Sequence, residues 1–490
     1  MLVAMTRPLA MALAALALGG CVELRPRQFV DEAVSPAPST GWRGREEAPP
    51  PASESPGAVP PEARSGAPLA LTALLDIALR TSPLTRAAWH DARGAAAQVG
   101  VKNSAYYPML ELDAQLQGLH QTVVSGQRMD PARVNSVGVG PAAVLNYLVL
   151  DLGGRAADVD EARAQLAFAN LTHTAAVQDL VLRVEQAYYQ LLAFKALRVA
   201  SASNLNEAEV ALSAATERQR SGLATLADVL QAKTAASQAR LTQRTVEGLV
   251  ETAKGGLSAA LGLPATTALV VGELPETVDV HSIGKTVDVL VAEAQAQRPD
   301  LAAARTQVPR AEARARSVWS AGLPSVLFSG NAGYLFYATP SGSLGGENVT
   351  AQLLLRVPLF TGFRDTYLVA QAEEAVAAAK ARLEATQEQV TLQVWTSYQS
   401  LTTASQRLGA ARDLLDSAKA STDVATGRYE AGAGTLLDLL TAQASLAAAR
   451  AQEVQVRADY LVALASLAHD TGALDLRPRD RTPPAGDSTR

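Results

Sequence analysis

Two copies of one short motif, 210 residues apart, constrain this chain more than any other feature of its sequence. Residues 218–232 and 428–442 match at Arg218, Gly222, Thr225, Leu226, Asp228, Leu230 and Ala232, and at Arg428, Gly432, Thr435, Leu436, Asp438, Leu440 and Ala442. A fixed period indicates an internal repeat. We therefore expect two similar halves, each made of a helix, two strands, a long helix, a glycine-containing turn and a second long helix.

Apolar residues around the motifs are spaced by three and four, as in coiled coils. In the second half the series runs through Leu408, Ala411, Leu415, Ala418, Thr422, Ala425 and Tyr429, then through Leu440, Ala444, Ala447, Ala451, Val454, Ala458, Leu461 and Ala465. A repeat of about 3.5 residues predicts long supercoiled helices. Residues 155–220 would span roughly 100 Å at about 1.5 Å per residue. Gly222 and Gly432 are expected to reverse the chain into antiparallel helix pairs.

Four short segments instead alternate apolar and polar residues with a period of two, which is typical of strands with one apolar face. They lie at about 109–123, 134–150, 325–337 and 348–360. One interpretation is two amphipathic hairpins packed on a soluble core, but no separate globular segment remains to cover them. The other is a lipid-facing sheet, which needs about ten residues per strand.

Lipid does not tolerate an open sheet edge, and four strands cannot close a barrel, which needs about eight even for a packed interior. Several copies must then contribute strands, and three copies would give twelve. The predicted fold is mainly α with a small β part, in which helices pair as long antiparallel coiled coils and the strands of several copies form a transmembrane β-barrel; the resemblance described below implies that the helices form an α-barrel.

The N-terminus predicts export and a lipid anchor. Arg7 precedes an apolar run at 9–18, and Leu18, Gly19 and Gly20 stand directly before Cys21, the one cysteine of the chain. Leu-Gly-Gly-Cys resembles a bacterial lipobox, so residues 1–20 are expected to be a signal peptide and Cys21 the lipid attachment site. The alternative is an ordinary signal peptide followed by an incidental thiol. No other run approaches the about 18 apolar residues that a spanning helix requires.

The remaining boundaries follow from composition and from the repeat. Residues 21–69 are predicted to be the lipidated N-terminus with a proline-rich tether, and residues 473–490 a disordered tail. The first structural repeat is placed at 70–280, with its long helix pair at 155–262. The second is placed at 281–472, with its pair at 363–470.

Catalytic and nucleic-acid-binding patterns are not found in the sequence. The net charge of −5 offers no electrostatic attraction for nucleic acid. The five histidines are scattered without ligand spacing, so neither a metal nor another cofactor is expected. Aromatic residues make up 4% of the chain against 48% hydrophobic residues, a composition typical of alanine- and leucine-rich helix packing. We expect a protein that is not an enzyme.

These features together resemble the TolC-like outer-membrane efflux protein family, in particular its lipid-anchored branch, which serves resistance–nodulation–division pumps. The resemblance covers about residues 70–472 and rests on the paired turn motifs and on two strand-to-helix junctions. The junctions are Val149-Leu150-Asp151-Leu152-Gly153-Gly154-Arg155 and Val357-Pro358-Leu359-Phe360-Thr361-Gly362-Phe363-Arg364. Their mutual register is uncertain by one residue.

The resemblance implies a homotrimer with a twelve-stranded barrel in the outer membrane and a twelve-helix tunnel in the periplasm. The turns at Gly222 and Gly432 would lie deepest, where they form a closable aperture and contact a periplasmic adaptor protein. Arg218, Arg428 and Glu430 are candidates for an ionic ring that holds the aperture shut. Thr225, Asp228, Thr435 and Asp438 are expected to cap helices and are candidates for docking as well.

The predicted function is a passive exit duct for small molecules from the periplasm to the outside, opened by the adaptor and an inner-membrane pump. An alternative is the outer-membrane component of a type I protein secretion system. A third interpretation, a coiled-coil structural lipoprotein without a pore, explains the heptads and Cys21 but leaves the strands unexplained.

Overall fold

The computed structural model describes residues 26–42, 60–61, 66–124, 131–278, 285–339 and 342–473. Cys21, the predicted signal peptide, most of the predicted tether and the predicted tail beyond Ala473 lie outside these ranges. The expectations that concern them therefore stay predictions.

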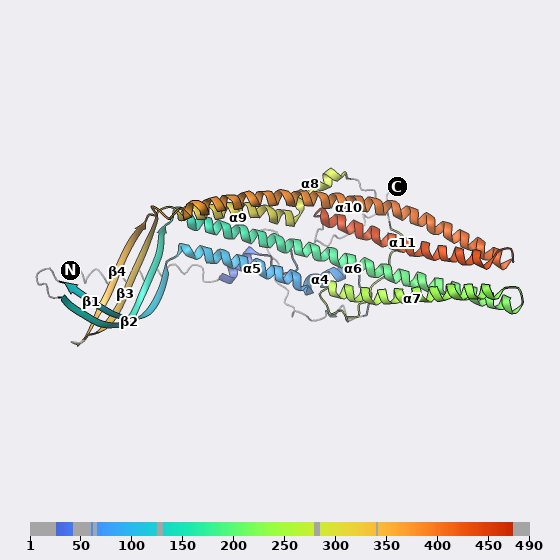
Figure 1. Ribbon diagram of the computed structural model, residues 1–490, viewed down its shortest axis with the longest axis horizontal. Coiled ribbons are helices and arrows are strands. Elements are labelled where there is room, and N and C mark those ends of the chain that lie inside the picture. The colour runs from blue at the N-terminus through green and yellow to red at the C-terminus, as the bar shows by residue number, and fades with distance from the viewer. Residues whose placement is uncertain are drawn as a thin grey trace, which may run out of the picture. The chain divides into compact units, whose positions relative to one another are not determined.

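The described chain is mainly helical and carries one antiparallel sheet, which confirms the predicted mixture of long helices with a small β part (Figure 1). In chain order the elements are α2 Pro26–Ala33, α4 Leu71–Thr81, α5 Pro83–Asn103, the 3-10 turn Ser104–Tyr106, β1 Met109–Val124, β2 Pro131–Leu150, α6 Gly154–Arg220, α7 Leu226–Ala260, α8 Val287–Gln297, α9 Pro299–Ala321, β3 Ser325–Thr339, β4 Gly342–Arg356, α10 Arg364–Glu430 and α11 Leu436–Asp470.

Two helices, and not the one expected, precede each pair of strands. The breaks fall at Ser82 and Arg298, each of which stands directly before a proline that begins the next helix. A residue before proline is pushed out of the helical region by the proline ring, and both residues have extended ψ angles of 122° and 123°. Proline is then well tolerated as the first residue of the following helix.

The chain divides into two compact units. The first contains the sheet, together with residues 92–108, 151–168, 304–324 and 357–383 of the adjoining segments. The second contains the described residues within 34–91, 169–303 and 384–473, and therefore α7, α11, the greater part of α6 and α10, and both helical turns.

The sheet has the strand order β1-β2-β3-β4, with every neighbouring pair antiparallel. Its register brings the predicted apolar residues into shared rows across the sheet. One row is Leu110, Leu145, Gly330 and Ala351, and another is Leu112, Ala143, Ala332 and Val349. Leu112 and Val349 are 80% and 66% exposed in the single chain. The apolar face predicted from the alternation is therefore present, and within the described chain it is uncovered.

The hairpin between β3 and β4 is longer than the sequence indicates. β4 was expected to begin near residue 348 but begins at Gly342, and β3 continues to Thr339. The cause is the ladder itself, in which Ser343, Leu344 and Gly345 pair with Ala338, Tyr337 and Phe336. Backbone pairing extends the strand through a glycine-rich stretch whose side chains carry no alternating signal.

The core of the second unit gathers at the base of the α6–α7 hairpin. Its fully buried members include Leu74, Ile77, Leu191, Leu257 and Leu261, drawn from α4, α6 and the end of α7. A short parallel bridge between Leu69 and Val271 closes over this region. Large aliphatic residues therefore concentrate here, whereas alanine predominates in the buried seam of α7.

The buried seam of α11 differs from the predicted one in its first half. Ala444 is exposed, and Leu439, Ala442, Leu446 and Ala449 are buried in place of the predicted residues, whereas Val454, Ala458 and Ala465 further along are buried as predicted. Because alanines occupy both candidate stripes, their hydrophobicity does not distinguish them. Packing against α10, through Leu415 and Ala418, selects the face that carries Leu446.

Candidate functional site

The two helical hairpins end in turns of the same construction, at residues 221–225 and 431–435. We call each turn together with its flanking residues, 218–230 and 428–440, a tip. Gly222 and Gly432 have φ angles of +75° and +74°, a conformation that strains any residue with a Cβ atom. The backbone N–H groups of Leu223 and Ala433 donate to the carbonyls of Arg218 and Arg428, at 2.7 and 2.8 Å. The glycines therefore end α6 and α10, as the sequence predicts.

Capping boxes start the return helices. Asp228 N–H donates to Thr225 Oγ1 at 3.2 Å, and Thr225 N–H donates to Asp228 Oδ2 at 2.8 Å. Thr435 and Asp438 repeat both bonds, each at 3.1 Å. The predicted capping role of these residues is confirmed, because each pair satisfies free N–H groups at a helix start.

The capping bonds also fix the charge at the tips. Hydrogen bonds from the backbone and side chain of Thr225 lower the pKa of Asp228 below its usual value. Bonds from the side chain and backbone of Thr435 lower the pKa of Asp438, with a smaller contribution from Arg428. Both carboxylates are ionised at neutral pH, so each tip presents a fixed negative charge.

Arg218 joins the two tips of the chain. Its Nη2 donates to the carbonyls of Tyr429 and Glu430 at 2.7 and 3.3 Å, and its guanidinium lies 4.1 Å from the centre of the Tyr429 ring. Tyr429 itself is buried together with Ala215, Leu436 and other residues of both hairpins. Sequence reasoning missed this contact because Arg218 and Tyr429 lie 211 positions apart.

Arg428 occupies the position in the second half that matches Arg218 but contacts its own turn, where Nη2 donates to Ala433 O at 3.4 Å. Among the described residues no ion pair joins Arg218, Arg428 or Glu430 to a carboxylate or a cation of the same chain. The ionic ring proposed for these residues is therefore not formed within one chain and stays a prediction about several copies.

Large apolar side chains are exposed on the tips. Leu223, Leu226 and Leu230 are 79%, 63% and 54% exposed on the first tip, and Leu437 is 60% exposed on the second. Beside the fixed carboxylates they form a mixed apolar and acidic surface at the end of both hairpins.

The strand-to-helix junctions share a two-residue turn with positive φ angles. These residues are Leu152 and Gly153 in the first junction, and Gly362 and Phe363 in the second. The turns are offset by 210 residues, as are the helix starts at Gly154 and Arg364. The structure thus settles the register that the sequence left uncertain, and Arg155 corresponds to Asp365 and not to Arg364.

Arg155 anchors the first junction. Its Nη1 and Nη2 donate to the carbonyls of Ala105 and Val149 at 3.3 and 3.2 Å, and it forms an ion pair with Asp151 at 3.3 Å. At the second junction Arg364 pairs only with the neighbouring Asp365, at 3.0 Å. Pro358 follows β4, in line with its predicted place between strand and helix.

An ionic network that sequence analysis did not identify surrounds the end of α11. His469 Nδ1 and Nε2 lie 2.9 Å from Asp470 Oδ1 and Asp179 Oδ1. Asp470 also accepts a hydrogen bond from Ser397 of α10. The buried Arg298 donates to Asp470 O at 3.2 Å. Three helices, α6, α10 and α11, and the α8–α9 junction meet here, and no spacing in the sequence indicates that they do.

Burial acts to lower the pKa of His469, but the hydrogen bonds and charges of Asp179 and Asp470 prevail and raise it to about 9. Burial likewise acts to raise the pKa of Asp470, whereas its bonds to His469 and Ser397 lower the pKa overall. At neutral pH the network therefore holds an imidazolium between two carboxylates.

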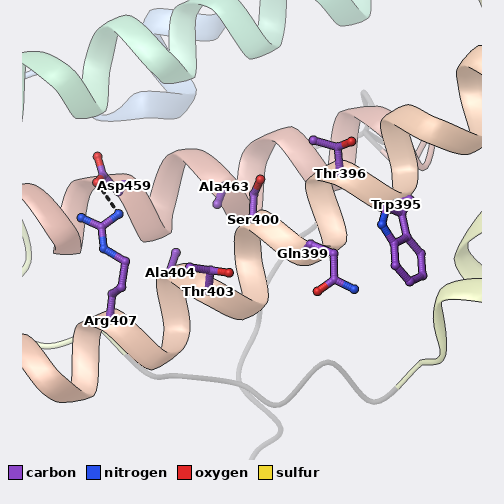
Figure 2. A pocket seen from close by; sticks show the side chains of 9 residues that line it. All are labelled: Trp395, Thr396, Gln399, Ser400, Thr403, Ala404, Arg407, Asp459 and Ala463. Atoms are coloured by element: carbon purple, nitrogen blue, oxygen red, sulfur yellow. Dashed lines mark hydrogen bonds and ion pairs between the residues drawn. The ribbon is translucent and has the colours of Figure 1, made fainter.

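Two surface grooves of the second unit meet at Trp395. One of about 740 Å³ lies between α8 and α10. The other, of about 530 Å³, lies between α10 and α11, and in Figure 2 Trp395 is at one end of it and the Arg407–Asp459 ion pair at the other. Neither contains a group of carboxylates, histidines or thiols that could bind a metal, and no such group occurs elsewhere among the described residues. None of the described helices is long and apolar enough to cross a membrane.

The chain is similar to outer-membrane proteins of known families. A family model described as outer membrane efflux protein matches residues 74–263 and 290–473. Protein CyaE of Bordetella pertussis is 29% identical over 98% of both chains. The pyoverdine export outer membrane protein OpmQ of Pseudomonas aeruginosa is 27% identical over 81% of this chain and 84% of its own. The crystal structure of the outer membrane protein VceC of Vibrio cholerae shares the fold, with a TM-score of 0.70 at 23% identity over 82% of this chain and 96% of VceC.

Proposed function

Because this chain belongs to the outer membrane efflux protein family, we propose that it is one subunit of a passive outer-membrane duct, through which a tripartite efflux system exports small molecules from the periplasm. The observation that carries the proposal is the uncovered apolar face of a sheet with two free edges, joined to long helical hairpins. A channel makes and breaks no bonds, so the energy for export comes from an inner-membrane pump.

The free edges support a trimer. β1 and β4 each pair on one side only among the described strands, and unpaired backbone groups are not stable in lipid. A second and a third copy would pair β4 of one chain with β1 of the next. The resulting barrel would have twelve strands. The apolar face, which includes the row that contains Leu112 and Val349, would face lipid, and the polar residues would face the lumen.

The repeat proposed from the sequence is supported by element bounds. α6 and α10 are both 67 residues long, α7 and α11 are both 35, and α10 and α11 begin 210 positions after α6 and α7. The family model also matches the chain as two segments. Three copies would then supply twelve helices to an α-barrel, and the two similar halves of each chain would give this barrel an approximate sixfold symmetry.

The tips are proposed to form the aperture and the adaptor contact. Exposed leucines beside ionised carboxylates suit a partner surface of mixed apolar and basic character. Arg218 holds the two tips of one chain together. Arg428 is exposed and forms no ion pair with a carboxylate among the described residues of its own chain, although it helps to lower the pKa of Asp438. It is available to pair with Glu430 or Asp438 of a neighbouring copy.

Arg428→Gln is expected to raise passive conductance of purified trimers in planar bilayers. If three copies each lose an exposed ion pair of about 0.5 kcal/mol, the open fraction rises by about tenfold. The control is Arg244→Gln on α7, whose ion pair with Glu247 lies within one helix. Equal conductance in wild type and Arg428→Gln would show that Arg428 does not hold the aperture closed. Preparations without heat-sensitive trimers or conductance would contradict the duct itself and favour a structural lipoprotein.

We also propose that Cys21 carries the lipid and that the chain belongs to the lipid-anchored branch of the family. The Leu-Gly-Gly-Cys sequence at the end of an apolar run supports this assignment. Cys21→Ser is expected to lose all incorporation of labelled palmitate, while it retains part of the trimer assembly because the barrel contacts are unchanged. Undiminished labelling of Cys21→Ser would contradict the anchor and leave the duct unaffected.

A further inference from the structure

The groove between α8 and α10 has an apolar end and an acidic end. Trp395 and Leu392 of α10, which are 50% and 64% exposed, form the apolar end together with Val291 of α8. Exposed aromatic and aliphatic side chains that line one groove are typical of a binding surface.

Three carboxylates line the other end, those of Asp288, Glu384 and Glu388. All three are exposed. No described cation of the chain forms an ion pair with any of them, whereas the neighbouring Glu293 is paired with Lys285 at 2.6 Å. The groove therefore favours an occupant that is apolar at one end and basic at the other.

The end of α11 lies at the apolar end of this groove. A methyl group placed on Gly472 would lie 3.1 Å from the backbone of Gln297 and Arg298, at the end of α8. Ser397 of α10 is hydrogen-bonded to Asp470. The chain therefore leaves α11 beside the end of α8, at the same level along α10 as Trp395.

The segment that follows has the matching order of side chains. Residues 474–476 read Leu-Asp-Leu, and residues 477–481 then read Arg-Pro-Arg-Asp-Arg, so the whole segment carries three arginines against two aspartates, with all three arginines in its second part. This segment has no pattern for a core of its own, and an extended segment needs none to bind in a groove. Pro478 favours an extended backbone.

The length of the groove also agrees with the length of the segment. Glu384 and Trp395 are 11 residues apart in α10, which corresponds to about 16 Å along a helix. Five extended residues, from Leu474 to Pro478, cover the same distance at about 3.3 Å per residue. Arginine side chains are long enough to reach carboxylates on either wall while their stems lie on apolar surface.

We propose that residues 474–481 bind in the groove between α8 and α10 of their own chain, with the leucines on Leu392 and Trp395 and the arginines at Asp288, Glu384 and Glu388. The neighbouring groove of Figure 2 suits this segment less well, because its one carboxylate, Asp459, is already paired with Arg407 at 3.5 Å. Bound in this way, the segment would fasten the end of α11 to α8 and α10. The proposal is independent of conduction.

The test is site-specific crosslinking in the full-length protein with Cys21→Ser, which removes the native thiol. Leu392→Cys is combined with Leu476→Cys and treated with a short bismaleimide. The matched control combines Leu476→Cys with Val424→Cys, an equally exposed position of α10 outside the groove. We expect a crosslinked product that migrates as a single chain. Its yield should be at least about fivefold above that of the control if the segment spends most of its time in the groove.

Charge reversal provides a second test of the proposal. Glu384→Lys with Glu388→Lys should reduce the crosslink yield several-fold, and adding Arg477→Glu with Arg479→Glu should restore it. Equal yields at Leu392→Cys and Val424→Cys would overturn the proposal. A product of two linked chains would also overturn it, because the occupant would then be the segment of another copy.

Discussion

Leu353→Arg is expected to prevent the protein from assembling in the outer membrane, whereas Gln352→Arg, one residue earlier in the same strand, is expected to be tolerated. Leu353 is paired with Phe328 on the apolar face and is 68% exposed in the single chain. Gln352 is paired with Ser329 on the opposite face. An arginine on a lipid-facing position costs about 2–4 kcal/mol at the middle of a bilayer and less toward either surface, and this cost would be incurred in every copy of the proposed trimer.

The measurement is the yield of heat-sensitive trimers on gels, and of protein folded into lipid vesicles, for both variants beside wild type. The two substitutions add the same charge and the same arginine side chain at adjacent positions of one strand, so their difference reports which face contacts lipid. If both variants assembled equally well, or if Gln352→Arg were the more damaging, the apolar face would not contact lipid. The barrel interpretation would then fail, even though the family assignment would stand.

His469→Gln is expected to remove a pH-dependent part of the stability of the second unit. The pKa of His469 is raised to about 9 in the folded protein, from an ordinary value of 6.5. A raised pKa means that protonation favours the folded state. The stabilisation is therefore complete below about pH 6.5 and is lost as the pH rises through about 9. A shift of this size corresponds to roughly 3 kcal/mol at most.

The experiment is a series of melting temperatures between pH 6 and pH 10 for detergent-purified protein. Wild type should be the more stable protein at pH 7, and its melting temperature should approach that of His469→Gln near pH 10. His90→Gln, an exposed histidine on α5, is the control and should follow the wild-type curve. Parallel curves for wild type and His469→Gln would show that the bonds to Asp179 and Asp470 do not hold a proton.

Several features of the site could be predicted from residue types close together in the sequence. Gly222 and Gly432 end helices because only glycine adopts their backbone conformation without strain. Thr225 and Asp228 cap the next helix because their side chains reach the free N–H groups of its first turn. The alternation through Leu110, Leu112 and Leu116 placed one apolar face correctly, since successive residues of a strand point to opposite sides.

Other features depend on residues that are distant in the sequence, and no local pattern indicates them. The contact of Arg218 with Tyr429 and the bonds of His469 with Asp179 join segments more than 200 residues apart. The extension of β4 back to Gly342 needed β3 as a partner. The seam of α11 could not be chosen from its alanines, because stripes of equal hydrophobicity differ only in the neighbour that packs against them.

Short-range chemistry thus specified where helices begin, turn and end, and which strand face is apolar. Backbone conformation, capping and alternation act over a few residues, so the local sequence contains all that they need. Helix pairing, the ion network at the end of α11 and the two tips joined by Arg218 were decided only when distant segments came together, because their energy depends on partners that the chain supplies from elsewhere.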